Sequence, residues 1–453
     1  MNLTERLDSV PWGRFHTVVT VALGIGWLLD AFEVTIVNNV VSVLKVQWHL
    51  SNVEASWILS IWFIGLMIGA YGFGYLADRF GRKQLFLITL LVYGVFTFLT
   101  AFSWNFQSMM VLRLLTAIGV GAEYSAINAS ISEFIPARHR GKTGATVMNF
   151  WPVGAILAAV VSLYVVNVLP PDIGWRVAFG FGALVAGSTA LIRSHIPESP
   201  RWLITQGNLV DAERVVSGIE QRHPWLGKTQ VKRHPGAPGN FWGQSHELLT
   251  RYPARVALGG LLDFSEAAGY YGLFAFLALF ILPGIHVTNG FVPLFYIVGN
   301  VGALVGGGMA AALLDRAGRK LTVPIFYLLA AGAVLLLAMS TTTHAWTWVL
   351  AAFTLANVFA TGSWISAYPT FSEIFPTHLR STGIGLSVAI GRFGAFSAPL
   401  VLTYVANAFG MVPALMLLAS FWLIGAAAMV PWYFRGVEGK GQALERLVTG
   451  EGA

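Results

Sequence analysis

Long apolar segments separated by short polar ones run through almost the whole chain. Twelve of them contain about 20 residues or more, which is enough for an α-helix to cross the hydrocarbon core of a bilayer. This pattern predicts an all-α polytopic membrane protein with twelve transmembrane helices. The predicted spans lie at about 16–44, 54–77, 84–103, 108–133, 143–168, 174–193, 254–282, 289–313, 321–341, 345–371, 381–407 and 411–434.

Three polar motifs occur twice, in the same order and at nearly the same spacing. Ordered matches of this kind indicate two copies of one unit, and tandem parallel halves are typical of transporters that bind substrate between the halves. We expect an N-terminal six-helix half at 1–193, a cytoplasmic central loop at 194–253 and a C-terminal six-helix half with a short cytoplasmic tail at 254–453. The matching motifs are Leu28-Leu29-Asp30-x-x-Glu33 with Leu261-Leu262-Asp263-x-x-Glu266, Asp78-Arg79-x-Gly81-Arg82-Lys83 with Asp315-Arg316-x-Gly318-Arg319-Lys320, and Ser132-Glu133-x-x-Pro136-x-x-x-Arg140 with Ser372-Glu373-x-x-Pro376-x-x-x-Arg380.

Composition agrees with the span pattern. The chain is 56% hydrophobic and only 11% charged, whereas a soluble domain carries about 25% charged residues. There is no cysteine, which excludes disulfides and cysteine-ligated metals. Topology explains the net charge of +7 better than nucleic-acid binding does. We expect the lipid bilayer as surroundings, with no nucleic acid, cofactor or metal.

The positions of lysine and arginine predict the orientation, because cytoplasmic loops collect these residues. They precede the first span and follow every even-numbered span, whereas the opposite loops hold Lys45 and Arg176. Both termini and the central loop are therefore expected in the cytoplasm, with the protein in a bacterial inner membrane. Within the central loop, Asp211 to Gln221 is predicted as a short amphipathic helix, and His234 to Asn240 as a turn region.

Each Asp-x-x-Glu pair lies near the centre of a predicted span. Ionisable groups at that depth are costly and by default mark a path for substrate or protons. Asp30 and Glu33 share a helix face, and two carboxylates so close in a low dielectric resist double ionisation. One of them should therefore take up and release a proton near neutral pH, and the same reasoning applies to Asp263 and Glu266. The alternative is that each acid is locked in a structural ion pair.

Two further charged residues lie on the fourth predicted span. Arg113 needs a carboxylate if it is buried, and Glu33 or Asp30 is the expected partner. Protonation of that acid would release the arginine. Glu123, on the same helix, is a candidate for a further proton or substrate ligand, or for a structural role.

Arg392 lies in the middle of the eleventh predicted span. Its planar guanidinium matches the two oxygens of a carboxylate substrate, and the alternative is an ion pair with Asp263 or Glu266. The intramembrane charges number five acids against two arginines. No histidine lies in the middle of a span, so carboxylates must carry any transported protons. Either protons neutralise some of the acids, or the substrate is a cation.

Aromatic residues are frequent near the expected cavity and suit a planar ligand or an organic cation. Each of them taken singly is more often a packing residue or an interface anchor. The candidates are Trp57, Trp151, Tyr270, Tyr271, Trp364 and Tyr368, of which Trp364 and Tyr368 share a helix face.

The repeated motifs at the cytoplasmic ends of the spans are predicted to act as a gate. Opposite charges at corresponding helix ends can pair across the two halves when the inside is shut, and these pairs would break on opening. The alternative is static anchoring of the loops. The predicted gate residues are Asp78, Arg82, Glu133, Arg140, Glu198, Arg201, Asp315, Arg319, Glu373 and Arg380.

These motifs resemble those of the major facilitator superfamily. Gly74-Tyr-Leu-Ala-Asp78-Arg79-Phe-Gly81-Arg82-Lys83 is similar to its signature loop, and Pro197-Glu198-Ser199-Pro200-Arg201-Trp202-Leu203 is similar to a motif shared by sugar porters and organic-ion transporters. The hexose-binding glutamine and asparagine signature is absent from the seventh span. Asp30-Ala-Phe-Glu33 resembles the Asp-Gly-Phe-Asp motif of bacterial aromatic-acid and niacin proton symporters. The resemblance implies Glu33 with Arg113 for proton coupling, and Arg392 for anion recognition.

We therefore expect a monomeric alternating-access carrier that imports a small organic carboxylate, in the simplest case an aromatic one, with a proton. A sugar or polyol porter and a proton-coupled organic-cation transporter are the alternatives within the superfamily. A solute sensor without transport is a more distant one. An enzyme is not expected, because no nucleophile–base pair or metal cluster appears in the sequence.

Overall fold

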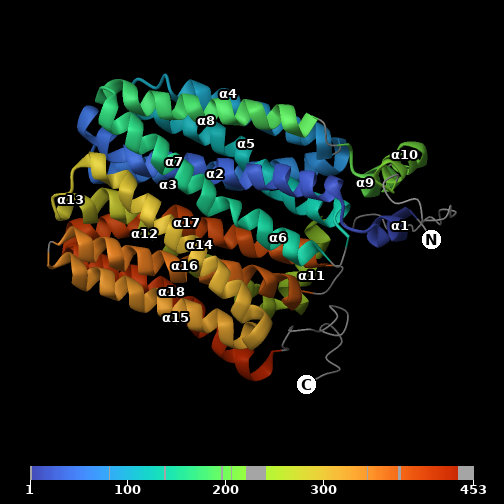
Figure 1. Ribbon diagram of the computed structural model, residues 1–453. Coiled ribbons are helices and arrows are strands. Elements are labelled where there is room, and N and C mark those ends of the chain that lie inside the picture. Colours follow the sequence, from blue (N-terminus) through green and yellow to red (C-terminus); the bar gives the residue numbers. More distant parts are fainter. Residues whose placement is uncertain are drawn as a thin grey trace. The chain divides into compact units, whose positions relative to one another are not determined.

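Helices dominate the computed structural model, which describes residues 3–80, 82–136, 139–194, 197–205, 207–220, 241–343, 345–375 and 379–436 (Figure 1). The first helices are α1 (Leu3–Ser9), α2 (Arg14–Gln47), α3 (Asn52–Phe80), α4 (Arg82–Thr100), α5 (Phe106–Phe134), α6 (Arg140–Met148), α7 (Phe150–Val168) and α8 (Pro171–Ser194). Three shorter helices follow, α9 (Pro200–Thr205), α10 (Leu209–Glu220) and α11 (Phe241–Arg251). The remaining elements are α12 (Pro253–Phe276), a π-helical turn (Leu277–Ile281), α13 (Leu282–Gly284), a 3-10 turn (Asn289–Phe291), α14 (Val292–Ala317), α15 (Arg319–Thr341), α16 (Trp346–Ile374), α17 (Arg380–Phe409) and α18 (Met411–Arg435).

The predicted all-α fold is confirmed, because each of the twelve predicted spans coincides with one helix or with consecutive helical segments. Within the described residues, nine helices are long and apolar enough to cross a membrane, and Leu87–Thr100 and Phe106–Gly121 are shorter apolar helices. The predicted amphipathic helix of the central loop is observed as α10. The predicted turn region at His234 to Asn240 lies outside the described residues.

Proline and glycine explain the interruptions between the long helices. Pro152 has no N–H to donate to the carbonyl of Met148, and its ring crowds that carbonyl, so the helix breaks between α6 and α7. Pro283 acts in the same way on the preceding turn, which widens into the π-helical segment Leu277–Ile281. Gly318 joins α14 to α15 with a φ of 78°, a left-handed conformation that favours glycine.

The chain forms two compact units. The first unit comprises Met1–Glu33, Ile64–Gly154 and Arg176–Ala237, and the second comprises Val34–Phe63, Ala155–Trp175 and Pro238–Ala453. Helices α2, α3, α7 and α8 contribute residues to both units.

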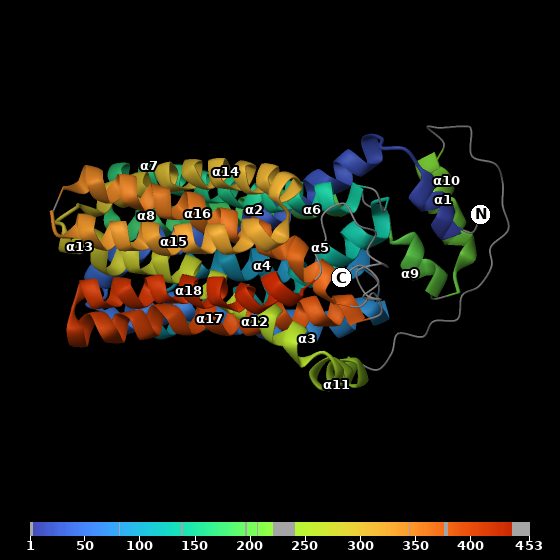
Figure 2. The same ribbon diagram turned by 90° about the horizontal axis from the view of Figure 1, so that it is seen from below.

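Helix α12 occupies a central position in the second unit. It packs against α17, α18 and α16, while α16 also packs against α14 and α15 (Figures 1 and 2). From Leu262 to Phe276, every residue of α12 except Phe264 is buried. Acidic side chains on this part of the helix are therefore removed from solvent by the packing of their own helix.

The short helix α1 packs on α10 within the first unit (Figure 2). Leu3 contacts a cluster that includes Leu203 and Val216, and Leu7 packs with Ile219. A helix of 7 residues is too short to be stable in water by itself. The helical structure of α1 therefore depends on this contact.

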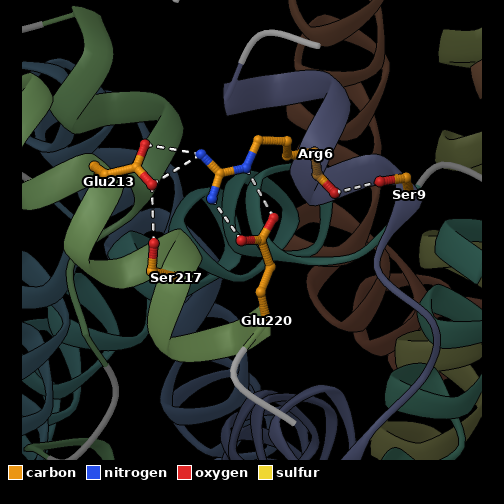
Figure 3. Close-up of polar contacts among 5 residues, drawn as sticks. All are labelled: Arg6, Ser9, Glu213, Ser217 and Glu220. Atoms are coloured by element: carbon orange, nitrogen blue, oxygen red, sulfur yellow. Dashed lines mark hydrogen bonds and ion pairs between the residues drawn. The ribbon is translucent and has the colours of Figure 1, made fainter. Parts of the chain in front are cut away.

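Arg6 makes the polar part of the same contact (Figure 3). Its Nε and Nη2 donate to the carboxylate of Glu220 at 2.9 and 2.5 Å, and its Nη1 donates to both oxygens of Glu213 at 2.8 Å. The hydrogen bond to Glu220 raises the pKa of Arg6. Burial alone would raise the pKa of Glu213, but hydrogen bonds from Arg6 and Ser217 outweigh it and lower that pKa. The stabilisation from Glu213 is therefore present above the ordinary pKa of a glutamate and is lost as the pH falls through the lowered value.

Replacing Arg6 with alanine should release α1 from α10. The Glu220 side chain is only 10% exposed, and breaking a buried ion pair costs about 3 to 5 kcal/mol. Hydrogen exchange of the α1 and α10 amides should then accelerate by about a hundredfold or more. Arg214→Ala is the matched control, because this arginine lies on α10, is 75% exposed and pairs with Asp211, so exchange should not change. Unchanged exchange in Arg6→Ala would mean that apolar packing alone holds α1.

Candidate functional site

Glu33 and Arg113 form a buried ion pair in the first unit. Glu33 lies on α2 and Arg113 on α5, and Arg113 Nη1 is 3.8 Å from Glu33 Oε2. Their side chains are 1% and 2% exposed. The predicted pairing of Arg113 with the first acid pair is confirmed. The separation is longer than a hydrogen bond, so the two groups interact mainly through their charges.

Several side chains surround this pair. Asp30, one turn before Glu33 on α2, is 2% exposed and interacts electrostatically with both members. Tyr93 and Thr97 of α4 also lie close to the Glu33 carboxylate. Two acids therefore share one arginine in a site closed to solvent, and a proton on one acid would balance the charge.

A second cluster in the second unit has the same charge composition. Asp263 and Glu266 of α12 and Arg392 of α17 are 1%, 6% and 7% exposed, and the arginine interacts electrostatically with both acids. Asp263 packs against the α17 backbone, since a Cβ atom at Gly391 would lie 1.6 Å from Asp263 Oδ2. Within the described residues, neither carboxylate oxygen of Asp263 has a hydrogen-bond partner.

Aromatic residues predicted for substrate binding belong to this second cluster. The Tyr271 ring centroid is 5.9 Å from Arg392 Cζ, within the range of a cation–π contact. Tyr368 interacts electrostatically with the two acids and with Arg392, and its ring makes an edge contact with Trp364 at 6.1 Å. The predicted shared face of Trp364 and Tyr368 is thereby confirmed, and Tyr270 makes an edge contact with Tyr271 at 5.4 Å.

The other two predicted aromatic residues lie in different units. Trp57 makes an edge contact with Phe396 of α17 at 5.9 Å in the second unit. Trp151 makes an edge contact with Trp27 of α2 at 5.8 Å in the first unit. Trp57 thus contacts α17 one turn after Arg392, whereas Trp151 contacts α2.

Three of the predicted gate residues have described side chains. Glu198 accepts a hydrogen bond from the backbone N–H of Ser199 at 2.9 Å, immediately before α9. Arg319 donates to the carbonyl of Leu314 at 3.4 Å across the α14–α15 turn, and Arg201 is partly buried. The side chains of Glu123 and of the remaining gate residues lie outside the described part of the chain, namely Asp78, Arg82, Glu133, Arg140, Asp315, Glu373 and Arg380.

Sequence reasoning missed a tyrosine in each cluster. The Tyr93 hydroxyl donates to the carbonyl of Leu29 at 3.4 Å, and the Tyr327 hydroxyl of α15 donates to the carbonyl of Leu262 at 2.9 Å. In both units a tyrosine from a neighbouring helix is thus held against the residue that precedes the aspartate. A buried tyrosine within an apolar span was a signal for such a role, because its hydroxyl needs a partner.

Among the residues that the structure describes, no group of three or more histidine, aspartate or glutamate side chains is placed to hold a metal ion. The two clusters themselves are made of carboxylates, guanidinium groups and phenols. These groups can exchange protons, bind anions or cations, and stack against flat ligands.

Known transporters are similar to this protein over almost the whole chain. Residues 22–449 match the family model described as sugar (and other) transporter. The chain is 32% identical to the niacin transporter NiaP of Acinetobacter baylyi, over 99% of this chain and 100% of that protein. It is 28% identical to the organic cation/carnitine transporter 7 of Arabidopsis thaliana, over 88% of this chain and 87% of that one.

The fold is similar to that of solved transporters. A partially occluded, inward-open structure of the xylose transporter XylE from Escherichia coli superposes with a TM-score of 0.75 at 19% sequence identity, covering 93% of this chain and 100% of that chain. The structural similarity shows the fold, and the sequence matches show the family. The chain is a multi-pass membrane protein that belongs to the sugar (and other) transporter family of the major facilitator superfamily.

Proposed function

We propose that this protein imports a small organic carboxylate, in the simplest case an aromatic one, together with a proton. The name of the Acinetobacter relative supports this substrate class, because niacin is a pyridine carboxylate. The observation that carries the proposal is the presence of a buried arginine with two buried acids in each unit. A carrier of anions and protons needs both kinds of group in a site closed to bulk water.

Proton coupling is assigned to Asp30, Glu33 and Arg113, with Glu123 as a further candidate. The Glu33–Arg113 contact of 3.8 Å supports this role, because it depends on charge and would weaken when Glu33 takes a proton. Release of Arg113 would then change the attraction between α2 and α5. An ion pair that forms and breaks in each cycle is a physical link between protonation and helix packing.

Substrate binding is assigned to the second cluster. Arg392 offers a planar pair of donors to a carboxylate, and Tyr271 lies at its side with a face suited to an aromatic ring. Asp263 and Glu266 complete the cluster, together with Tyr270, Trp364, Tyr368 and Trp57; Trp151 is the candidate contributed by the first unit.

Transport would follow the alternating-access scheme of the superfamily. The charged helix ends are proposed as the cytoplasmic gate, and the alternation of lysine and arginine along the chain supports cytoplasmic termini and a bacterial inner-membrane location. A single chain carries both halves of the predicted cavity, which supports a monomer as the working unit.

Transport of an organic cation is the second candidate. It is favoured by the excess of acids over arginines around α12 and by the name of the Arabidopsis relative. In that case Asp263 and Glu266 would bind the ligand directly and Arg392 would only balance their charge. A sugar or polyol substrate is the remaining alternative, and its only support is the family description.

Arg392→Ala distinguishes these possibilities. We expect niacin affinity of the purified protein to fall by about ten- to a hundredfold, because charge-assisted hydrogen bonds contribute about 1.5 to 3 kcal/mol. The measurement is isothermal titration of wild type and variant with niacin, with tetraethylammonium and xylose as the cationic and sugar probes. Arg255→Ala is the matched control, since this arginine also lies over a tyrosine ring, 5.3 Å from the centroid of Tyr252, at the start of α12.

Niacin affinity should be unchanged in Arg255→Ala. Equal niacin affinity in wild type and Arg392→Ala would remove the anion-binding role of Arg392. Binding of tetraethylammonium alone, at full strength in Arg392→Ala, would favour the cation transporter.

A further inference from the structure

Three helices of the second unit contribute rings to one aromatic layer. Phe274 of α12 lies 5.2 Å from Tyr296 of α14, measured between ring centroids. Phe353 of α16 lies 5.7 Å from Phe274 and 6.2 Å from Tyr296. The Tyr296 hydroxyl donates to the carbonyl of Phe274 at 2.7 Å, and all three residues are buried. This layer is closed to solvent, and its phenol already has a partner.

A second layer of side chains lies one helical turn away. Helix α12 presents Tyr270, α14 presents Asn300 and α16 presents Asn357, and Tyr270 stacks on Phe274 at 4.6 Å. Consecutive spans alternate in direction, so the turn before the α12 ring meets the turns after the α14 and α16 rings. A Cβ atom at Gly299 would lie 3.3 Å from Asn357 Nδ2, which places this amide beside the neighbour of Asn300. We call these three side chains the amide layer.

Each asparagine of the amide layer uses one polar atom and leaves the other. Asn300 Nδ2 donates to the carbonyl of Tyr296 at 2.8 Å, a bond that the amide oxygen could not make. Asn357 Oδ1 accepts from the Thr361 hydroxyl at 3.5 Å. Both asparagines are 0% exposed, and among the described residues Asn300 Oδ1 and Asn357 Nδ2 have no hydrogen-bond partner. Because buried polar atoms are normally paired, the layer offers one acceptor and one donor to a ligand.

Two tyrosine rings connect this layer with the arginine proposed for substrate binding. Arg392 Cζ lies 5.9 Å from the ring centroid of Tyr271, which lies 5.4 Å from that of Tyr270. Asn357 is also two turns before Trp364 on α16, so both lie on one face of that helix. A flat ligand with its carboxylate at Arg392 would extend along the tyrosine rings toward the two amides.

We propose that the amide layer recognises the ring of the substrate, with Asn357 Nδ2 donating to an acceptor atom in that ring. Asn300 Oδ1 supplies an acceptor for an N–H or a polarised C–H beside that atom. The substrate class is then a heteroaromatic carboxylate. A plain aromatic carboxylate binds weakly, because it leaves the buried donor unpaired. This inference rests on the proposed function, in which Arg392 holds the carboxylate.

The test compares niacin with benzoate, which lacks the ring nitrogen but has nearly the same shape and the same charge at neutral pH. Isothermal titration of the full-length wild type should give about ten- to a hundredfold tighter binding of niacin, the effect of leaving one buried donor unpaired. In Asn357→Leu, niacin affinity should fall by a similar factor while benzoate affinity is retained or improved. The preference for niacin should therefore disappear.

Thr354→Val is the matched control on the same helix. This change keeps the side-chain shape and removes a hydroxyl that donates to the carbonyl of Leu350 in its own helix at 2.7 Å. The preference for niacin should be unchanged. Equal loss of both affinities in Asn357→Leu would overturn the proposal, because the amide would then have only a structural role, such as holding a buried water. Equal binding of niacin and benzoate by the wild type would also overturn it, and would leave the proposed function intact. Binding of neither carboxylate would reject the proposed function itself.

Nitrogen-15 magnetic resonance of ring-labelled niacin gives a readout that does not require a variant to fold. A hydrogen bond donated to the ring nitrogen moves its resonance upfield, so the signal of niacin bound to the wild type should lie upfield of that in an aprotic solvent. A bound signal at the aprotic position would overturn the proposal. In Asn357→Leu, the signal of any bound niacin should return toward that position.

Discussion

Replacing Glu33 with glutamine should abolish substrate accumulation driven by a pH gradient while leaving exchange of substrate across the membrane. Glutamine has nearly the shape of a protonated glutamate but cannot release a proton. The side chains of Glu33 and Arg113 are only 1% and 2% exposed, and the charge attraction between them would be lost permanently. The variant should therefore behave as a carrier locked in the protonated state, which moves substrate down its gradient only.

The measurement compares two assays in proteoliposomes loaded with purified protein. Uptake of labelled niacin against its gradient, with the outside acidic, should not exceed the external concentration in Glu33→Gln. Counterflow, in which internal unlabelled niacin exchanges for external label, should continue. Full accumulation by the variant would remove Glu33 from the coupling mechanism.

Asp30→Asn is the companion variant, because Asp30 lies one turn away on α2 and interacts with the same arginine. It keeps the direct contact between Glu33 and Arg113. Retained accumulation in Asp30→Asn, together with its loss in Glu33→Gln, would assign the transported proton to Glu33. The reverse result would assign it to Asp30.

Replacing Gly391 with alanine should disrupt the second cluster. The added Cβ would lie 1.6 Å from Asp263 Oδ2 and 3.0 Å from Asp263 Cβ. Rotation of the carboxylate can relieve the first contact, but the second persists unless α12 and α17 move apart. Overpacking of this kind costs about 1 to 3 kcal/mol, and it would shift the α12 acids relative to α17, the helix that carries Arg392.

We expect Gly391→Ala to lose measurable niacin binding and to unfold at a lower temperature than the wild type. Gly385→Ala on the same helix is the control, because a Cβ there has nothing within 4 Å. That change should leave binding intact and stabilise the helix slightly, since glycine costs about 1 kcal/mol relative to alanine in a helix. If Gly391→Ala bound niacin with wild-type affinity, the contact between Asp263 and the α17 backbone would have no part in substrate recognition.

The fold was predictable from local properties of the chain. Segment length and apolarity determine which stretches cross a bilayer, and proline positions account for the breaks near Met148 and at Leu277–Ile281. A spacing of three residues is enough to place Asp30 and Glu33 on one helix face, and Asp263 and Glu266 on another. These features depend on residues within a few turns of one another, which is why the sequence carries them directly.

The partners of these residues were decided only by the tertiary structure. Residue spacing by itself allowed either Glu33 or Asp30 as the partner of Arg113, and the packing of α2 against α5 places the contact at Glu33. Tyr93 and Tyr327 were missed because a phenol in an apolar span has no periodic pattern to mark it. Arg6 and Glu220 are separated by 214 residues, and no local rule joins them. The length of an apolar segment and the periodicity of a helix depend on residues that are close together in the chain. Which side chains become neighbours depends on lateral packing between helices, and the sequence by itself does not reveal that packing.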